Sequence, residues 1–293
     1  MSLSINLQRK VEQSIHLLES LPKGIQLEVA YSGGKDSDVI LHLAKQVPNL
    51  NFKAVYKLTT IDPAGTIAHV RSKGVEILKP KESFFTLFDR KGMPNRWRRW
   101  CCSALKEYFT SEWMCTGVRR SESRARTERY QEPIECRAYC KNKRSQIVMP
   151  ILFWDDEDME EYIEENDIQC HPLYYDENGK FRVRRRLGCM CCPLKSPIRR
   201  IEEFKKNPQM LRLYLKHLFV YFKKHIDKPF NELWEYTCEK FFASVWLWRN
   251  PSSIHEYRTT LFGTATCQSM IEYAFNVDLK DLYYQLFYVE EEK

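Results

Sequence analysis

The sequence predicts an α/β fold with a central, mostly parallel sheet, followed by a helical C-terminal region. Short apolar runs such as QLEVAY (26–31) and FKAVYKL (52–58) alternate with segments whose apolar residues have helical spacing. This alternation is typical of a parallel sheet that helices cover on both faces. From about residue 201 onward the chain has helical spacing and many aromatic residues. We therefore expect a first domain over 1–200 and a helical region over 201–293.

The expected elements follow from the apolar spacing along the chain. Helices are expected at 5–20, 38–46, 66–74, 103–113 and 155–167. Strands are expected at 26–31, 52–58, 75–79, 114–118 and 146–152. Residues 119–144 are rich in arginine and have little apolar periodicity, so we expect loops near a ligand there. The acidic segment 155–167 should be a helix with a solvated polar face.

Composition and charge exclude several classes of protein. The 293 residues are 43% hydrophobic and 29% charged, which allows a sizeable buried core. Only ten glycines and thirteen prolines occur, which excludes a fibrous or disordered chain. No apolar run reaches the length of about 18 residues that a membrane span needs, and the charged N-terminal segment lacks a secretory signal. We therefore expect a soluble, cytoplasmic protein whose eleven cysteines are reduced thiols, available for metal binding or catalysis. The net charge of +7 favours a polyanionic partner, with an ordinary basic surface as the alternative.

A glycine-bearing loop between the first expected strand and the next helix is the strongest motif. It reads SGGKDS and comprises Ser32, Gly33, Gly34, Lys35, Asp36 and Ser37. Glycines let the backbone approach an anion closely, and the first N–H groups of the following helix bind phosphate oxygens. The lysine adds a positive charge, and the aspartate can hold a Mg²⁺ ion that bridges phosphates. A plain strand-to-helix turn is the alternative; a Walker A loop is excluded because G-x-x-x-x-G-K-[ST] is absent.

The hexapeptide resembles the signature of the PP-loop, or N-type, ATP pyrophosphatases, which cleave ATP between the α and β phosphates. The chain is similar, more narrowly, to the phosphoadenosine phosphosulfate (PAPS) reductase-like branch of that family. The similarity is carried by TTIDP (59–63), RWCCSALK (99–106), TGVRRSESRAR (116–126) and the stretch 149–175. It covers about residues 25–195 and implies a Rossmann-like adenine nucleotide α-hydrolase fold. ATP, or a sulfonucleotide, would lie at the carboxyl ends of the strands.

The resemblance also implies which residues surround the nucleotide. Beyond the loop these are Thr59, Thr60, Asp62, Gly117, Val118, Arg119, Arg120, Arg124 and Arg126. Lys35, Asp36 and Arg119 form the catalytic set that we expect. A turn with a helix cap is the alternative for the threonines and Asp62, and a solvated loop is the alternative for the arginines. His171 matches an H-P-L segment near the pocket, with a structural turn histidine as the alternative.

Cysteines in two segments, Cys101-Cys102 and Cys189-x-x-Cys192, form the second motif. Four thiolates can close a tetrahedral site for zinc or bind a [4Fe–4S] cluster, and spacing does not separate the two. The pattern resembles that of the iron–sulfur sulfonucleotide reductases, where all four cysteines ligate one [4Fe–4S] cluster. The resemblance implies Cys101, Cys102, Cys189 and Cys192 as ligands, with zinc as the less favoured metal.

Other cysteines leave alternatives open. Cys191 can replace either neighbour as a ligand, and adjacent cysteines strain a common site, so that only one of Cys101 and Cys102 would bind. Cys136 and Cys140 form a third candidate pair. We expect four further cysteines to be buried structural thiols: Cys115, Cys170, Cys238 and Cys267.

The resemblance favours ATP activation over sulfonucleotide reduction. Assimilatory reductases carry a nucleophilic cysteine in an E-C-G-[IL]-H tail, whereas the last cysteine of this sequence is Cys267, in TATCQSM. ATP pyrophosphatases of DNA phosphorothioation systems (the Dnd and Ssp types) combine an SGGKDS loop with an iron–sulfur centre and no such tail. The resemblance to them implies cleavage of ATP to AMP and pyrophosphate, which activates a substrate by adenylation for sulfur incorporation. DNA is the expected acceptor, and a cysteine desulfurase or another modification-complex protein is the expected partner.

Contact with nucleic acid would use basic and aromatic side chains. Lysine and arginine neutralise phosphates, and Trp97 and Trp100 can stack on bases. The NRWRRW segment (95–100) can equally anchor the cysteine loop in the core. The alternative functions are a PAPS or adenylylsulfate reductase that uses another thiol, a non-catalytic nucleotide- or DNA-binding subunit of a modification complex, and a tRNA-thiolating enzyme.

Overall fold

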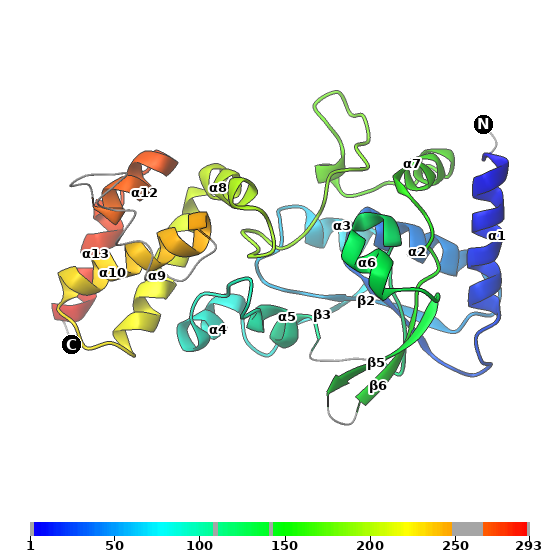
Figure 1. Cartoon of the computed structure of the whole chain (residues 1–293), viewed down its shortest axis with the longest axis horizontal. Helices are drawn as coiled ribbons and strands as arrows, with labels where there is room; N and C mark the ends of the chain where they lie inside the picture. Colours follow the sequence, from blue (N-terminus) through cyan, green and yellow to red (C-terminus); the bar gives the residue numbers. More distant parts are fainter. Residues whose placement is uncertain (1–2, 108–110, 141–142, 248–265, 292–293) are drawn as a thin grey trace. The chain divides into compact units, whose positions relative to one another are not determined.

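The computed structural model describes residues 3–107, 111–140, 143–247 and 266–291. The chain divides into two compact units, whose elements are labelled in Figure 1. Unit 1 comprises Met1–Pro80 and Leu105–Gly188, and unit 2 comprises Lys81–Ala104 and Cys189–Lys293. The chain therefore enters unit 2 twice, and the boundary expected near residue 200 lies within the second of these segments. No helix in the described part of the chain is long and apolar enough to cross a membrane.

Unit 1 is built on a six-stranded sheet with the order β3-β2-β1-β4-β6-β5. The strands are β1 (Leu27–Tyr31), β2 (Phe52–Lys57), β3 (Glu76–Leu78), β4 (Trp113–Cys115), β5 (Ile134–Cys140) and β6 (Lys143–Val148). All neighbouring strands are parallel except β5, which pairs antiparallel with β6. The predicted α/β fold class with a mostly parallel sheet is confirmed.

The strand order determines where a ligand can bind. From β1 the chain proceeds to β2 on one side of the sheet, and β4 then pairs with the other side of β1. Val29 of β1 lies in register with Ala54 of β2 and Cys115 of β4. The order of the strands reverses between β1 and β4, and ligands of open α/β sheets bind outside the carboxyl ends of the strands at such a point. The SGGKDS loop follows β1 directly.

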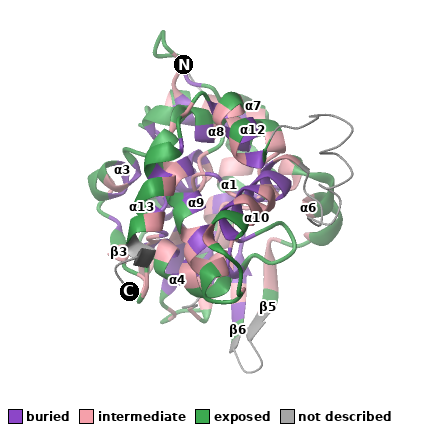
Figure 2. Ribbon diagram, turned by 90° about the vertical axis from the view of Figure 1, so that its left-hand side faces the viewer, coloured by how far each residue is buried: buried purple, intermediate pink, exposed green. Residues whose placement is uncertain are grey.

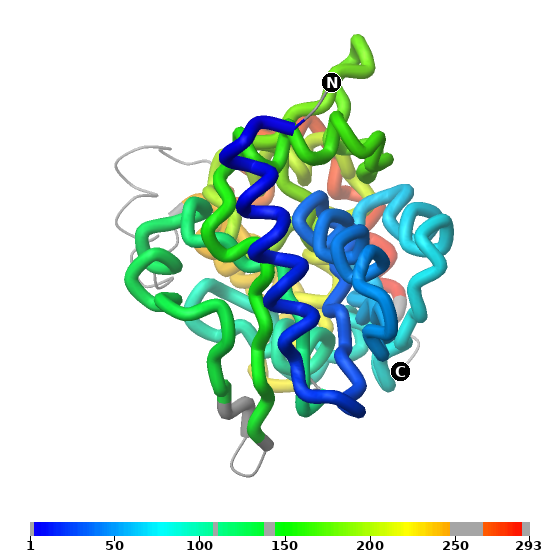
Figure 3. Tube along the Cα trace, turned by 90° about the vertical axis from the view of Figure 1, so that its right-hand side faces the viewer, coloured from blue at the N-terminus to red at the C-terminus, as the bar shows by residue number. Residues whose placement is uncertain are grey.

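Unit 1 also contains α-helices and short 3₁₀ helices. They are α1 (Ile5–Glu19), α2 (Lys35–Gln46), α3 (Thr66–Ser72), α6 (Arg124–Arg129), α7 (Asp156–Glu165) and the 3₁₀ helices η1 (Arg120–Glu122) and η2 (Pro172–Tyr174). The first helix, α1, runs beside α2, as Figure 3 shows, and α2 also contacts α7. By contrast α6 is exposed along most of its length (Figure 2).

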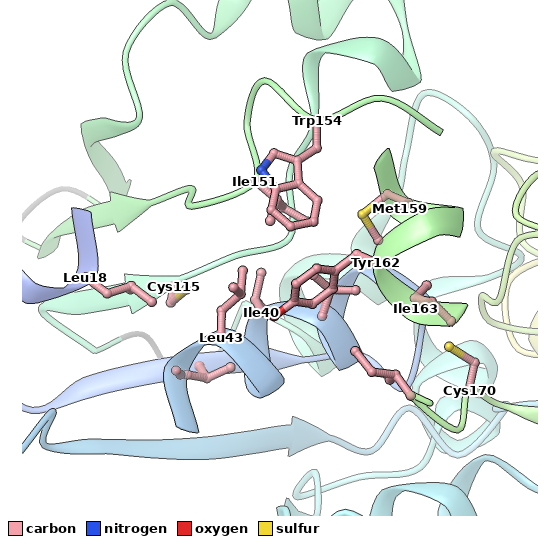
Figure 4. Packing of buried hydrophobic residues seen from close by; sticks show 14 of the residues in the cluster. Leu18, Ile40, Leu43, Cys115, Ile151, Trp154, Met159, Tyr162, Ile163 and Cys170 are labelled. Atoms are coloured by element: carbon pink, nitrogen blue, oxygen red, sulfur yellow. The ribbon is translucent and has the colours of Figure 1, made fainter. Parts of the chain in front are cut away.

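The main core of unit 1 lies between these helices and the sheet. Figure 4 shows Ile40 and Leu43 of α2 near Tyr162 of α7, whose ring centroid lies 5.1 Å from that of Trp154. Cys115 and Cys170 belong to the same buried cluster. Burying one such large apolar side chain contributes about 1.5–3 kcal/mol, so this cluster holds α2, and with it the loop that precedes α2, in a fixed position.

Two of the expected segments fold differently from the prediction. Residues 119–144 are not loops, because they contain η1, α6, β5 and the start of β6. The strand β5 pairs only with β6, so its polar residues need not be buried on both faces. The helix expected at 103–113 is also wrong at its ends, since α5 spans Trp100–Leu105 and Trp113 begins β4; residues 108–110 lie outside the described residues.

Unit 2 is helical, as predicted for the C-terminal region. Its helices are α4 (Phe84–Lys91), most of α5, α8 (Pro197–Lys206), α9 (Pro208–Lys223), α10 (Phe230–Phe242), the π-helical turn η3 (Ala243–Leu247), α12 (Cys267–Phe275) and α13 (Lys280–Glu291). Aromatic rings fill its core. The Tyr214 ring lies 5.5 Å from Phe88 and 5.2 Å from Phe204 between ring centroids, so α4 of the first segment packs on α9 of the second.

Candidate nucleotide site and thiol cluster

The loop between β1 and α2 has the close-packed backbone that a glycine pair allows. Gly33 has a φ of 77°, in the left-handed region that side chains other than hydrogen disfavour. A Cβ atom on Gly33 would lie 3.3 Å from Leu187 and 3.4 Å from Thr66, and one on Gly34 would lie 3.2 Å from the Tyr174 hydroxyl. The backbone turn therefore favours glycine at position 33, and close contacts disfavour a side chain at both positions.

The first turn of α2 has no side-chain cap at its N-terminus. Gly34 is the N-cap residue and supplies no side-chain acceptor. The Ser37 hydroxyl and the Ser37 backbone N–H both donate to the Gly34 carbonyl, at 2.6 Å and 2.9 Å, which fixes the turn. Ser32, the first residue of the loop, is exposed. A phosphate group is the ligand that such a helix start suits, because its dipole favours negative charge.

Three charged residues meet next to this helix start. Lys35 Nζ lies 3.0 Å from Asp36 Oδ2, and Arg119 Nε donates to Asp36 Oδ1 at 2.7 Å. Arg119 is 1% exposed and donates a second bond, from Nη2, to Asp156 Oδ1 at 2.9 Å. The structure thus brings together the three residues expected to be catalytic. Asp156, in the first turn of the acidic helix α7, was missed in the sequence because we treated that helix as solvated.

Gly117 explains how Arg119 reaches the loop. A Cβ atom at Gly117 would lie 2.9 Å from the Asp36 Cβ atom and 3.0 Å from its backbone carbonyl. Only a residue without a side chain lets the end of β4 approach α2 so closely. Arg120, the next residue along the chain, has other contacts than Arg119. Its backbone N–H donates to the Leu152 carbonyl at 2.9 Å, and its guanidinium stacks on Phe153 at 5.6 Å from the ring centroid.

The residues after β2 form a turn. Asp62 accepts from the Thr59 backbone N–H at 2.9 Å and from the Thr59 hydroxyl at 2.7 Å. Thr60, at the tip, is exposed and has a φ of 63°. The Asp62 carboxylate therefore stabilises the turn that was part of the alternative, but it caps no helix, because the N-cap residue of α3 is Gly65. Thr60 is the member of this set that faces solvent.

A buried polar network lies below the loop and was not expected from the sequence. Tyr31 donates to Asp38, and His69 Nε2 lies 3.1 Å from the same carboxylate oxygen and 3.0 Å from the Tyr31 hydroxyl. Burial, and then the charge of Asp38, raise the pKa of Tyr31. His171 caps η2 by accepting the Leu173 N–H at 3.1 Å, and burial lowers the pKa of its imidazole. These contacts support β1 and α2 from within.

Exposed arginines gather around Glu122. Arg126 forms an ion pair with Glu122, and Arg186 donates to the Glu122 carbonyl at 3.3 Å. Arg124 is 92% exposed and pairs with Glu128 at 2.7 Å. Burial, followed by the charge of Arg186, lowers the pKa of Arg126. We call Arg124, Arg126 and Arg186 the arginine surface; it belongs to unit 1, on α6 and the loop before Cys189.

In unit 2 the structure brings the four predicted cysteines into one neighbourhood. The pKa of Cys101 is raised by a hydrogen bond with Cys102, by burial, and by the charges of Cys102, Cys192 and Cys189. Burial and the charges of Cys189 and Cys102 likewise raise the pKa of Cys192, although a backbone hydrogen bond at Leu194 opposes them. Two of these cysteines come from α5 and two from the loop before α8. Thiols with raised pKa values stay protonated at neutral pH unless a metal ion displaces the protons.

Cys191 lies inside the second pair but has a different environment. It is fully buried, with a φ of 53°, and its backbone N–H donates to Glu203 at 2.7 Å. Burial, followed by the Glu203 charge, raises the pKa of its thiol to about 12. Lys195 forms an ion pair with the Glu203 carboxylate and donates to the Cys189 carbonyl at 3.0 Å. These contacts hold the loop that carries Cys189, Cys191 and Cys192 in place.

Donor chemistry and orphaned polar atoms show that a negatively charged metal centre fits here. The four thiols offer sulfur ligands, and three buried donor atoms, on Arg200 and Tyr214, have no hydrogen-bond partner in the described part of the chain. In that same part, the one group of His, Cys, Asp and Glu ligand atoms that lie within 4.8 Å of one another is Glu235, Glu239 and Cys267. No three of the four sulfurs thus lie within 4.8 Å of one another, whereas tetrahedral zinc geometry places all four about 3.8 Å apart.

The other candidate residues from the sequence divide into exposed and buried ones. Cys136 is exposed on β5, and the side chain of Cys140 lies outside the described residues. Trp97 is 82% exposed, whereas Trp100 is buried, donates to the Gly92 carbonyl at 3.0 Å and stacks on Phe84. Cys115, Cys170, Cys238 and Cys267 are buried, as expected. Glu235 accepts the Cys267 backbone N–H at 2.8 Å, so it also caps α12.

Comparison with known proteins gives one family match and distant similarities to solved structures. No curated protein matches the chain. The U34-tRNA thiolase NcsA from Methanococcus maripaludis, solved with its [4Fe–4S] cluster, is 15% identical; the match covers 75% of this chain and 80% of that chain with a TM-score of 0.43. The NH3-dependent NAD synthetase from Campylobacter jejuni, in complex with nitrate, is 12% identical over 77% of this chain and 99% of that chain, with a TM-score of 0.41.

A family model, the phosphoadenosine phosphosulfate reductase domain, matches residues 26–195. The matched stretch begins at β1 and includes the SGGKDS loop, Arg119 and all four cysteines of the cluster. It extends over more than half of the chain. The chain therefore belongs to the phosphoadenosine phosphosulfate reductase domain family.

Proposed function

We propose that the protein is an ATP pyrophosphatase that adenylates a substrate for sulfur incorporation. The observation that carries this proposal is the convergence of Lys35, Asp36 and Arg119 at the uncapped start of α2. An oxygen of the substrate would attack the α-phosphorus, the bond to the β-phosphate would break, and AMP would be transferred while pyrophosphate leaves. Preorganised positive groups lower the barrier of such a phosphoryl transfer because they stabilise the charge that develops on the leaving oxygen.

Each residue of the site has a role in this proposal. The N–H groups of the loop and of the first turn of α2 would hold the pyrophosphate part of ATP. Lys35 and Arg119 would neutralise charge next to the breaking bond. Asp36 fits a Mg²⁺ ion, because its carboxylate supplies hard oxygen ligands and is 21% exposed. When bound, Mg²⁺ would neutralise phosphate charge, and Asp36 would then share its oxygens between that ion and the neighbouring cations.

Product analysis with Mg-ATP tests the reaction. ATP labelled on the α-phosphate should yield AMP, and the released phosphorus should appear as pyrophosphate. We expect Asp36→Asn to lower turnover by about 100-fold or more, since charge stabilisation of this kind contributes two to three orders of magnitude. The matched control is Asp176→Asn, which changes an acid of the same unit that pairs with Arg182 outside the site. Release of ADP and orthophosphate would contradict the proposal.

We further propose that Cys101, Cys102, Cys189 and Cys192 bind a [4Fe–4S] cluster. Four thiols from two segments and the spread of their sulfur atoms support the larger centre over zinc. When bound, the cluster would supply an iron site for sulfur chemistry. Anaerobic purification should give a brown protein, and Cys192→Ser should lose iron and sulfide whereas Cys136→Ser should keep them. Stoichiometric zinc in the wild-type protein would contradict the choice of metal.

DNA is the acceptor that we propose. The arginine surface and the net charge of +7 support a polyanionic substrate. DNA should bind with an affinity that falls as salt increases, and Arg124→Ala with Arg186→Ala should make the salt dependence weaker by about one unit per lost phosphate contact. Stronger binding to tRNA than to duplex DNA would favour tRNA thiolation. The sulfur would come from a cysteine desulfurase or another protein of the modification complex, which a sulfur-transfer assay with that partner tests.

The family match favours sulfonucleotide reduction as a second candidate function. A PAPS or adenylylsulfate reductase would release sulfite from its nucleotide when thioredoxin supplies electrons. Sulfite release without pyrophosphate release from ATP would select this function. Nucleotide or DNA binding with neither activity, even with the partner present, would select a non-catalytic subunit of a modification complex.

A further inference from the structure

Two large polar side chains of unit 2 are buried with unused hydrogen-bonding capacity. Arg200 of α8 and Tyr214 of α9 are each 1% exposed. The Arg200 guanidinium donates from Nη1 to the Ser244 carbonyl at 2.7 Å. Its Nε and Nη2 atoms, and the Tyr214 hydroxyl, have no partner among the residues that the structure describes.

Such groups are costly unless something binds them. A buried hydroxyl without a partner destabilises the folded state, and a buried charge without one does so more strongly. More than about 90% of buried polar groups in native proteins are satisfied. Burial lowers the pKa of Arg200, while Tyr214, Cys191 and Cys192 act to raise it. Three unpaired donors in one neighbourhood indicate that an acceptor binds there in the functional protein.

The surroundings identify the side from which this acceptor comes. Around Tyr214 the rings of Phe84, Phe88 and Phe204 lie within 5.2–5.8 Å between centroids, and none of them accepts a conventional hydrogen bond. After burial, the charges of Cys191, Cys101 and Cys192 contribute to raising the pKa of Tyr214. The hydroxyl therefore lies in an aromatic environment and within electrostatic range of these cysteines.

Glu203, whose charge also acts to raise the pKa of Arg200, is engaged by other donors. Glu203 already accepts from the Cys191 backbone N–H at 2.7 Å and from Lys195. The Arg200 bond to the Ser244 carbonyl uses only Nη1, so Nε and Nη2 still lack an acceptor among the described residues. The sulfur side of the cluster remains as the source of negative charge.

We propose that Arg200 and Tyr214 are positioning residues that donate hydrogen bonds to the sulfur atoms of the metal centre held by the four cysteines. This inference rests on the proposed thiolate ligation by Cys101, Cys102, Cys189 and Cys192. A centre bound by four thiolates carries negative charge, and donors next to its sulfurs stabilise that charge. Such donors raise the reduction potential of an iron–sulfur cluster and slow the loss of the metal.

Tyr214→Phe tests the hydroxyl with little change in packing, because the ring and its aromatic neighbours remain. In the metal-free protein this variant should melt at the same or a higher temperature, since it removes an unpaired buried group. In the loaded protein it should release iron to a chelator about 10-fold faster, and the midpoint potential should become more negative. A merely structural tyrosine would instead lower the melting temperature in both states. Tyr221→Phe, on the same helix, is the matched control and should change none of these values.

Arg200→Met tests the second donor in the same way. Methionine keeps most of the side-chain length and removes the buried charge. Its loaded form should also release iron faster and have a more negative midpoint potential. Arg199→Met, which changes the neighbouring exposed arginine of α8, should behave like the wild-type protein.

The possible results separate this inference from the proposed function. If the wild-type protein holds the cluster and both variants keep its release rate and potential, the inference is wrong and the cluster stands. If the wild-type protein holds zinc, the proposed iron–sulfur centre is wrong, and the release rates of zinc decide the inference by the same comparison. If it holds no metal through these cysteines, both are wrong.

Discussion

At the scale of single residues, the nucleotide site depends on how closely two backbones approach. Arg119 reaches Asp36 at 2.7 Å because β4 ends against the first turn of α2. That approach is possible only while Gly117 has no side chain, since a Cβ atom there would lie 2.9 Å from the Cβ of Asp36. The glycine therefore controls the geometry of a charged pair without contacting a substrate itself.

Gly117→Ala should damage the site and the fold together. Overpacking of this kind costs about 1–3 kcal/mol of unfolding free energy, which urea denaturation measures. A displacement of about 1 Å at the Arg119–Asp36 pair should lower the release of AMP by about 100-fold. Gly179→Ala is the control, because Gly179 also has a positive φ but has nothing within 4 Å of its Cβ position. It should destabilise through backbone strain and leave turnover unchanged; equal turnover in the two variants would contradict the role of Gly117.

At the scale of elements, the N-terminus of α7 holds Arg119 from the other side. Asp155 caps this helix by accepting from the backbone N–H groups of Glu157 at 2.9 Å and Asp158 at 3.0 Å. The Asp158 carboxylate accepts the Asp155 N–H at 2.8 Å, which completes a capping box. Asp156, the next residue, binds Arg119, so the helix cap supports the site.

Asp155→Ala should remove this cap. We expect a loss of about 1 kcal/mol in unfolding free energy at neutral pH, because two helix N–H groups lose their acceptor. The affinity for ATP should also fall as the first turn of α7 loosens. Glu164→Ala, at an exposed position of the same helix, should be close to neutral in both measurements. A neutral Asp155→Ala would show that water replaces the cap without cost.

The contribution of Asp155 should depend on pH. Burial raises the pKa of its carboxyl, but the backbone N–H of Asp158 and the charge of Lys10 outweigh it, so the pKa is lowered in the folded state. A lowered folded pKa means that the stabilisation is present above the unfolded pKa of about 3.9 and is lost as the pH falls through the folded value. The difference between wild type and Asp155→Ala should therefore vanish in acid. Urea titrations between neutral pH and about pH 3 measure it.

The strands and helices with clear apolar periodicity were predictable from the sequence. The edge strand β5 and the residues that reach a site only through the tertiary fold were not. QLEVAY and FKAVYKL are apolar because β1 and β2 are central strands. By contrast β5 pairs with β6 alone and carries Glu135 and Arg137, so its sequence lacks an apolar signal. The SGGKDS loop was evident because glycine and charge occur together. Asp156, Arg200 and Tyr214 join their sites only through the tertiary fold, and no local spacing reports that.

At the scale of the whole molecule, the two chemical motifs belong to different compact units. The nucleotide loop and Arg119 lie in unit 1, and the four cysteines lie in unit 2. Unit 1 has its own apolar core around α2, and unit 2 has an aromatic core around Tyr214. A ligand stabilises the part of a protein that binds it by mass action, by about 2.7 kcal/mol when its concentration is 100 times its Kd.

Calorimetry should therefore show two ligand responses with different targets. Mg-ATP should raise the melting transition of unit 1. Removal of the metal by a chelator should lower the transition of unit 2, because the proposed thiolate-bound centre would crosslink α5 to the loop before α8. Cys192→Ser should reproduce the effect of the chelator and keep the response to Mg-ATP, whereas Asp36→Asn should weaken that response and keep the metal. If both ligands shift one common transition by the same amount in every variant, the units unfold together and their sites are thermodynamically coupled. Separate shifts would mean instead that nucleotide binding and metal loading are independent properties of two folded bodies, each assembled around its own core.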